Sequence, residues 1–445
     1  MNQSRNLTFS ETHTHVHLLA ACWAMGIMLS PESLVLLGNI SGTAGISLIV
    51  ILAAAALLYL MTAGTISRIA GDKNGSGEET DVLKQQLGNL AGTILPFAAR
   101  GSVAVVGATA MLVTAGFVFN EVFVYWFPNF AAAFILLAVL LGIQLMGERA
   151  RSVAQMVFAS TAILGLLALT VAGLINMRPF PSESIAPASI AFHPGTRFLP
   201  LLLLVGFDLA GIASGNDPSR QAFISRGMML AIIGAAFLLG LWAVASIRYV
   251  PVEKLADSTI PHMIAARRIM GQPGRYIMGI VVISGVCAAV NALFIGLSRL
   301  WVAMNRTGGL HGSENRSKSS DRAPLIVLAL SAGAMMAAGM AGTEVLDRWF
   351  RGGLLLWMSY YAAIHMAAWR SGRRSPSATR IVQLLNIIAC ILLTVAVTVL
   401  VITDDSPAAI ISFMILALAL AASLFVMLSR LSRRNSCSCS AKRCS

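Results

Sequence analysis

The sequence predicts an all-α polytopic membrane protein with about twelve transmembrane helices. Its 445 residues are 57% hydrophobic and only 11% charged, and the mean hydropathy is +0.78. Soluble domains carry more charge than this, because their surfaces face water. A transmembrane helix needs about 20 apolar residues to cross ~30 Å of hydrocarbon. Such segments lie at 16–38, 44–67, 97–119, 128–146, 154–176, 198–215, 226–247, 275–302, 323–343, 352–369, 381–402 and 407–429.

The net charge of +13 is distributed as a topology signal. If the N-terminus lies inside, 23 of the 32 Lys and Arg residues fall in cytoplasmic segments. Among them, Arg100 and Arg299 are expected to anchor their spans at the inner interface. Basic residues in short loops favour the cytoplasmic side of a membrane. We therefore expect a multi-pass membrane protein with both termini cytoplasmic and no nucleic-acid partner.

No segment between the spans is long enough to fold as a soluble domain, so ligand chemistry must take place within the membrane. Residues 15–430 are predicted to form one membrane domain. Residues 1–14 are expected to be a cytoplasmic N-terminus, and residues 431–445 a basic tail rich in Cys and Ser.

Histidines and cysteines cluster near the two ends of the chain, at His13, His15, His17, Cys437, Cys439 and Cys444. Neither cluster has four ligands at a known metal-site spacing, so no metal and no cofactor are expected. Solvated termini are the simpler interpretation. Acylation of the tail cysteines, beside basic residues, is the alternative for that end.

Two predicted spans are interrupted by glycine-containing segments roughly 180 residues apart. Irregular backbone inside a bilayer survives only where it is buried in protein or lines a cavity. A pair of interrupted spans in the two halves of a chain points to the central site of a transporter. Close packing of small residues between helices is the alternative. The residues expected to line the site are Ala24, Met25, Gly26, Ile27, Gly206, Phe207, Asp208 and Gly211.

Asp208 and Glu32 are the candidates for coupling transport to an ion. A charged group inside the membrane costs at least ~2.5–3.5 kcal/mol, so it is usually retained for function. Asp208 has the alternative of a structural acid at the broken helix, and Glu32 that of a carboxylate favoured by the helix dipole. Packing is one interpretation of Phe207, beside the second break. In the tenth span we expect packing or interfacial aromatics and a histidine near the cytoplasmic end, namely Trp357, Tyr360, Tyr361 and His365.

Five motifs occur in an order that resembles the amino acid–polyamine–organocation permease superfamily over about residues 15–430. They are Gly26-Ile27 with Pro31; Gly147-Glu148 through Gln155; Gly206-Phe207-Asp208 with Asn216-Asp217-Pro218 and Arg226; Asn291-Ala292 with Ser298-Arg299 and Ala303-Met304; and Arg322-Ala323-Pro324. Two departures accompany the resemblance. Ala24 stands where the superfamily has its first glycine, and no lysine occurs between Lys84 and Lys254.

The resemblance implies a leucine-transporter-type core of two inverted five-helix repeats, about 16–176 and 198–369, with extra helices at about 381–429. The first and sixth helices would be broken, and alternating access would proceed around a site between them. The implied function is secondary transport or exchange of amino acids or related amines across the plasma membrane, coupled to H⁺ or Na⁺. The nearest subclass comprises compact bacterial permeases and exporters of neutral amino acids. The resemblance also implies the bacterial inner membrane as the location, and covering a bound substrate as the alternative role of Phe207.

A second class of function is a non-transporting membrane sensor or an intramembrane enzyme. A metalloprotease is expected to carry His-Glu-x-x-His and a serine hydrolase Gly-x-Ser-x-Gly, and neither pattern occurs in the sequence. A sensor is expected to add a soluble signalling domain. The sequence therefore favours a transporter over an enzyme.

Overall fold

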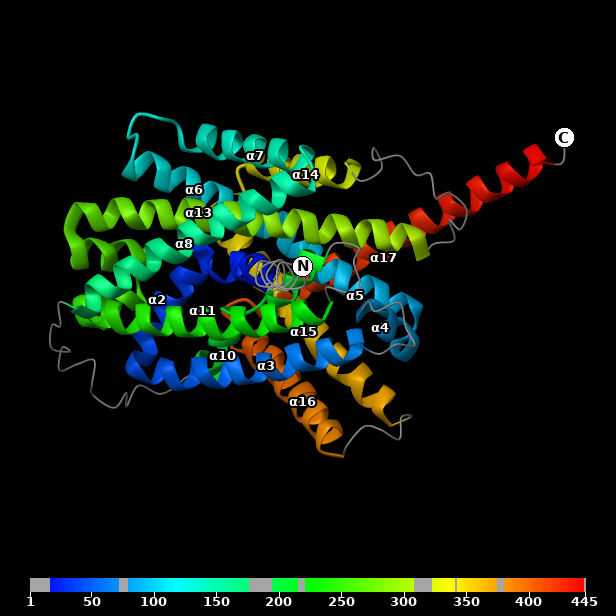
Figure 1. Ribbon diagram of the computed structural model, residues 1–445. Helices are drawn as coiled ribbons and strands as arrows, with labels where there is room; N and C mark the ends of the chain where they lie inside the picture. Colours follow the sequence, from blue (N-terminus) through cyan, green and yellow to red (C-terminus); the bar gives the residue numbers. More distant parts are fainter. Residues whose placement is uncertain are drawn as a thin grey trace, which may run out of the picture.

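The computed structural model describes residues 17–71, 79–175, 194–214, 221–307, 322–340, 342–373 and 380–443. These residues form helices joined by short connections, without a strand in any of the described ranges. Among the described residues, eight helices are long and apolar enough to cross a membrane, and shorter apolar helices lie at His17–Met28, Asn129–Leu145 and Ala323–Ala337. The predicted all-α polytopic fold is therefore confirmed (Figure 1).

The first half of the chain follows the predicted spans closely. Its helices after residue 30 are α2 (Pro31–Ala44), α3 (Leu48–Gly71), α4 (Glu79–Leu87), α5 (Asn89–Ser102), α6 (Ala108–Val122), α7 (Asn129–Leu145) and α8 (Glu148–Ile175). The π-helical turn Val103–Gly107 joins α5 to α6, so these two helices together form the predicted third span. Helix α4 is short and polar, and it packs against α5.

The second half contains the longest helices. They are α10 (Pro194–Leu202), α11 (Gln221–Tyr249), α12 (Val252–Ala256), α13 (Pro261–Thr307), α14 (Ala323–Ala337), α15 (Glu344–Gly372), α16 (Arg380–Ile402) and α17 (Pro407–Arg443). Gly271, at φ 67°, kinks α13 just before the predicted span begins at residue 275. Each predicted span thus overlaps a helix or a pair of helices.

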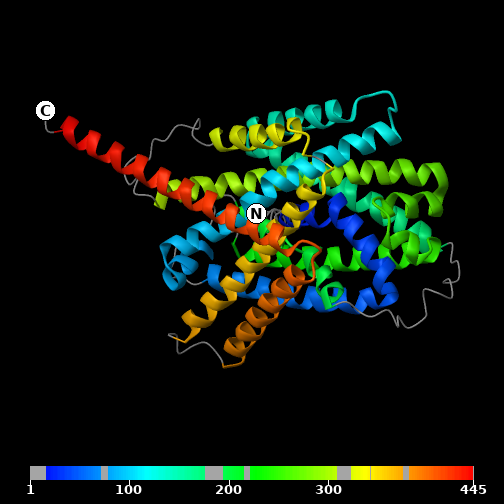
Figure 2. The same ribbon diagram turned by 180° about the vertical axis from the view of Figure 1, so that it is seen from behind.

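Helix α13 lies along the middle of the bundle and packs against α8, α6 and α2. Both views of the fold show α7 and α14 on one side of α13, while α3 and α16 lie on the other side (Figures 1 and 2). Helix α15 packs against α16, α5 and α3, and so connects the two sides. The C-terminal end of α17 extends away from the bundle in both views.

The first interrupted span breaks three residues after Gly26. The apolar helix ends at Met28, and α2 starts at Pro31, a residue suited to the first helical turn. Ser30 caps α2 by accepting a hydrogen bond from the N–H of Ser33. Gly26 itself is helical, and it allows close packing on α13, because a Cβ there would lie 2.9 Å from the carbonyl oxygen of Ala288. The break thus lies at residues 29 and 30, within the expected segment that runs from Ala24 to Pro31.

The second interrupted span breaks at Gly206, as predicted. Helix α10 ends at Leu202, a turn follows, and the 3-10 helix η3 runs over Phe207–Ser214. Gly206 has φ 99°, a conformation that a residue with a side chain rarely adopts. The motif residues Asn216, Asp217 and Pro218 lie outside the described residues.

The predicted end segments are only partly described. Residues 1–14, with His13 and His15, lie outside the described residues. In the predicted tail, the backbone of α17 stays helical to Arg443. The boundaries of the two repeats stay a prediction.

Candidate functional site

A buried ion pair lies at the second break. Asp208, in the first turn of η3, has a side chain that is 1% exposed. Its Oδ2 accepts hydrogen bonds from Nε of Arg100 at 3.0 Å and from Nη2 at 2.5 Å. Arg100 belongs to α5, and its side chain is 10% exposed. The two charges therefore neutralise each other away from water, where removing one partner leaves a costly unpaired charge.

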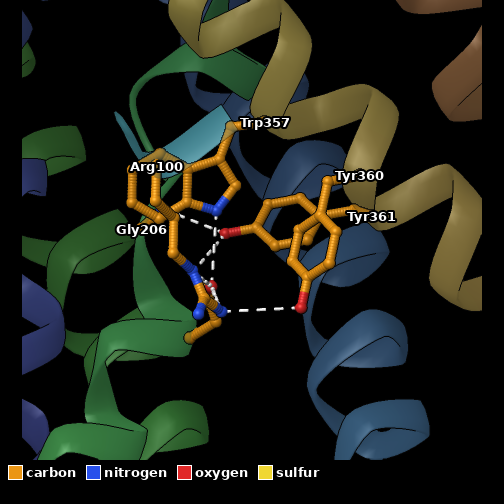
Figure 3. Close-up of polar contacts among 6 residues, drawn as sticks. Arg100, Gly206, Trp357, Tyr360 and Tyr361 are labelled. Atoms are coloured by element: carbon orange, nitrogen blue, oxygen red, sulfur yellow. Dashed lines mark hydrogen bonds and ion pairs between the residues drawn. The ribbon is translucent and has the colours of Figure 1, made fainter. Parts of the chain in front are cut away.

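Helix α15 supplies two more donors to the same carboxylate. Trp357 Nε1 donates to Oδ2 of Asp208 at 3.3 Å, and Tyr361 Oη donates to Oδ1 at 2.6 Å. Tyr361 Oη in turn accepts the backbone N–H of Gly206 at 3.1 Å. Figure 3 shows the side chains from α15 converging on Arg100 and Gly206. One carboxylate thus ties α5, η3 and α15 together.

Aromatic rings surround this ion pair. The guanidinium of Arg100 lies 5.4 Å from the centroid of the Tyr360 ring, a cation–π distance. Phe207 packs between Tyr361, at 4.9 Å, and Tyr59 of α3, at 5.4 Å between ring centroids. This packing supports the structural interpretation of Phe207 in the present conformation. The hydroxyl of Tyr59 is buried without a hydrogen-bond partner among the described residues, which is costly unless a ligand or water satisfies it.

Of the two alternatives for Trp357, Tyr360 and Tyr361, the structure shows packing, because all three are buried at the ion pair. One sequence prediction is wrong at this point: Arg100 does not anchor a span at the membrane interface but lies in the core. One signal in the sequence could have shown this. Arg100 falls inside the predicted span 97–119, where a cation requires a partner. Asp208 is the corresponding carboxylate in the span that breaks.

The first break lies directly against the second. The side chain of Ile27 is 2% exposed, and its Cδ1 lies 3.0 Å from where a Cβ on Gly206 would stand. Ala24 and Met25 are buried on the same helix. The Cβ position of Gly26 faces away from this contact, toward Ala288. The packing interpretation therefore fits Gly26, whereas Ile27 and Gly206 bring the two breaks together.

A second polar cluster holds the first helix through neutral amides. Gln155 of α8 donates from Nε2 to the carbonyl of Cys22 at 2.9 Å. Asn291 of α13 donates from Nδ2 to Oε1 of Gln155 at 2.8 Å and to the carbonyl of Arg151 at 3.3 Å. Both amide side chains are fully buried. Two of the sequence motifs thus meet in space, and they fasten the helix that precedes the first break.

The remaining candidates lie apart from the ion pair. Glu32 is in the first turn of α2, and its buried Oε2 has no hydrogen-bond partner in the described ranges. Gly211 lies on η3, and a Cβ there would meet open space. Arg299 donates to the carbonyl of Ile212, at the other end of η3, at 2.6 Å. No group of three or more His, Cys, Asp or Glu among the described residues is placed to hold a metal ion.

A polytopic helical bundle in which two broken helices meet beside a buried ion pair has the architecture of a membrane transporter. The amino acid permease family matches residues 18–431, and the chain belongs to this family. It is therefore a multi-pass transporter of amino acids, and the family points away from an enzyme. A search of curated proteins finds no match to the chain. The resemblance seen in the sequence motifs is confirmed.

Proposed function

We propose that the protein is a secondary active transporter or exchanger of amino acids or related amines, working by alternating access across the plasma membrane. The substrate binds where Ile27 meets Gly206, between the helix His17–Met28 and η3. One observation carries this placement. The backbone N–H of Gly206 has as its acceptor a side-chain hydroxyl, that of Tyr361, which a ligand can displace.

The carboxylate of an amino acid is the natural competitor for this N–H. It is a stronger acceptor than a phenolic hydroxyl, and the start of η3 favours negative charge. When the substrate accepts the N–H of Gly206, the hydroxyl of Tyr361 leaves both Gly206 and Asp208. Helix α15 then loses one of its two direct bonds to η3. Substrate binding is thereby linked to the movement of α15 relative to the second break.

Asp208 couples substrate binding to the movement of α15 in this scheme, acting through its ion pair. The pair with Arg100 is net neutral, so the site has no fixed charge to bind a cationic or anionic side chain. Ile27, Phe207 and Tyr59 provide apolar surface around it. We therefore propose neutral amino acids with apolar side chains as the preferred substrates. Ala24, Met25 and Gly211 complete the proposed lining, Gly26 packs behind it against Ala288, and Glu32 is proposed as a second coupling carboxylate.

Counterflow in vesicles tests the proposal. The purified full-length chain is reconstituted in vesicles of phosphatidylethanolamine and phosphatidylglycerol that are loaded with unlabelled amino acid. Uptake of labelled leucine, methionine, serine, lysine, glutamate and putrescine is then compared with empty vesicles. We expect exchange of the neutral apolar amino acids and loss of that exchange in Gly206→Val. Absence of exchange for every compound would reject the proposed transport function.

A further inference from the structure

One turn beyond Tyr361, α15 carries a buried histidine that the scheme above does not use. His365 is 1% exposed. Its Nδ1 lies 2.9 Å from Oδ1 of Asn386 on α16, and its Nε2 lies 2.9 Å from Oγ1 of Thr62 on α3. Both ring nitrogens therefore have a partner. The sequence expectation that His365 lies near the cytoplasmic end did not anticipate its burial between three helices.

The two partners of His365 differ in what they can do. The amide oxygen of Asn386 only accepts, so Nδ1 carries a hydrogen. The hydroxyl of Thr62 both donates and accepts, and the carbonyl of Leu58 lies 3.0 Å from it as an alternative acceptor. In the neutral imidazole, Thr62 donates to Nε2. In the imidazolium, Nε2–H donates to Thr62, which turns its own hydrogen to Leu58.

This arrangement accepts a proton without leaving any polar group unpaired. One H⁺ adds to the lone pair of Nε2, one hydroxyl rotates, and no heavy atom has to move. Buried polar networks are costly when only partly satisfied, and this network is satisfied in both states. The geometry thus suits a reversible proton site better than a fixed structural contact.

A chain of polar contacts leads from His365 to the surface. Oδ1 of Asn386 also accepts from Oγ1 of Thr65 at 3.0 Å. Nη2 of Arg68 donates to the same threonine oxygen at 3.3 Å, and Arg68 is exposed. Thr62, Thr65 and Arg68 recur every three residues along one face of α3. These contacts fix the orientation of the imidazole through Nδ1 and link it to the end of α3 where Arg68 lies, which is the cytoplasmic side in the predicted topology.

The same histidine is adjacent to the substrate site. Tyr361 precedes His365 by four residues on α15, about 6 Å along the helix axis, and the two share one face. Tyr59 precedes Thr62 by three residues on α3, and its ring packs on Tyr361 at 5.6 Å between centroids. A movement of α15 that releases Tyr361 from Asp208 therefore also acts on the contact between His365 and Thr62.

The charged groups around His365 are few. Helix α3 presents Arg68, α4 carries Lys84, and α5 presents Arg100, whose charge is balanced by Asp208. Helix α16 presents the neutral Asn386, and α15 itself presents the hydroxyl of Tyr361. No described carboxylate is hydrogen-bonded to His365. The charge of a bound proton is thus not cancelled locally, so its release can drive a change in helix packing.

We propose that His365 is a proton-binding site that couples amino acid transport to a proton gradient, through Thr62 on α3 and Asn386 on α16. The proposal rests on the transport function proposed above and assigns its coupling ion as H⁺. The proton binds Nε2 of His365, beside the hydroxyl of Thr62, in one conformation and leaves when α15 has moved. Removing either the imidazole or its switchable hydroxyl partner abolishes coupling and leaves exchange in place.

The test compares two assays on the same reconstituted protein. Accumulation of labelled leucine driven by an imposed pH gradient reports coupling, while a pH dye inside the vesicles reports proton entry. Counterflow at equal pH on both sides reports exchange alone. The variants are His365→Gln and Thr62→Val, and Thr398→Val is the matched control. Thr398 also donates to the carbonyl four residues earlier, but at an exposed position on α16.

We expect gradient-driven accumulation and proton entry to fall to the no-gradient level in His365→Gln and Thr62→Val, with counterflow retained. Thr398→Val should match the wild type. The inference is overturned if the wild type moves no protons, or if both variants keep gradient-driven accumulation. If His365→Gln fails to elute as a monodisperse protein, Thr62→Val decides alone. Absence of counterflow in the wild type instead rejects the proposed function, so the two failures are distinguishable.

Discussion

The two broken spans are held in place by different kinds of polar contact. The second break is tied to its neighbours by charge, because Asp208 binds Arg100 of α5 and two donors of α15. The helix before the first break is tied by neutral amides, through Gln155 and Asn291. A charged contact that relies on several partners changes steeply when one partner leaves. A neutral amide contact costs less to break.

This difference assigns different roles to the two breaks. The second break carries the group that a substrate can displace and the ion pair that responds to it. At the first break, the side chain of Ile27 contacts Gly206, and Gly26 lets its helix pack closely against α13. We therefore interpret the first helix as the fixed wall of the site. The junction of η3, α5 and α15 is its moving part.

The largest expected effect comes from breaking the charged junction. Arg100→Met leaves Asp208 buried without its counter-charge, which should cost ~3–5 kcal/mol of stability and abolish counterflow. The double variant Arg100→Met with Asp208→Leu should recover most of that stability without recovering counterflow. Thermal unfolding in detergent, followed by a dye that labels the buried thiols of Cys22 and Cys287, measures the loss.

The matched control for that prediction is an exposed ion pair. Arg348 pairs with Glu344 at 2.7 Å on the surface of α15, with side chains 29% and 84% exposed. Arg348→Met should change stability by less than about 1 kcal/mol. If Arg100→Met were equally mild, or if the double variant transported normally, the charged junction would not be the working part of the site.

Alanine at the two glycines should separate the breaks by function. Gly206→Ala forces a side chain into φ 99° and against Ile27, so it should cost ~1–3 kcal/mol and also suppress counterflow. Gly26→Ala presses on the backbone of Ala288 and should cost ~1–3 kcal/mol. The fraction of Gly26→Ala that folds should keep the wild-type half-saturation concentration.

Gly64→Ala is the control for both glycine variants, because a Cβ at this position of α3 meets no atom within 4 Å. It should leave stability unchanged or raise it by up to about 1 kcal/mol. The assignment of roles to the two breaks would be reversed if Gly26→Ala shifted the half-saturation concentration strongly and Gly206→Ala left it unchanged.

A smaller effect is expected at the neutral junction. Asn291→Ala removes donors to Gln155 and to the carbonyl of Arg151, which should cost ~1–3 kcal/mol of stability. Counterflow rates per folded molecule should stay near the wild type. Gln383→Ala, which loses one partly buried bond to Gly372, should show a smaller loss of stability. Loss of counterflow in Asn291→Ala, without loss of folded protein, would mean that the amide cluster also moves.

The sequence predicted the fold well because membrane helices are specified by local composition. Each span needed only an apolar run, and the break at Gly206 was visible because glycine interrupts such a run beside an acid. The position of the first break was less visible. Gly26 allows its helix to pack closely on Ala288. From composition alone, a glycine that allows close packing cannot be distinguished from a glycine that forms a turn.

The partners of Asp208 could not be predicted from local sequence patterns. Arg100 lies 108 residues before Asp208, and Tyr361 lies 153 residues after it. Their pairing depends on how α5 and α15 pack against η3, which no local pattern encodes. Arg100 near a predicted inner end looked like an anchor, and the tenth-span aromatics left packing and interfacial positions both open. A search for a counter-charge to each ionised group within the membrane would have corrected the prediction for Arg100.

The central claim is that a substrate carboxylate competes with the hydroxyl of Tyr361 for the N–H of Gly206. Tyr361→Phe removes the competitor and keeps the ring, so the half-saturation concentration of leucine in counterflow should fall by up to about tenfold, the value of one net hydrogen bond. The maximal rate should fall as well, since binding no longer releases Asp208. Tyr276→Phe, at an exposed position, should change neither. A raised half-saturation concentration with an unchanged maximal rate would contradict the claim, because Tyr361 would then bind the substrate instead of yielding to it.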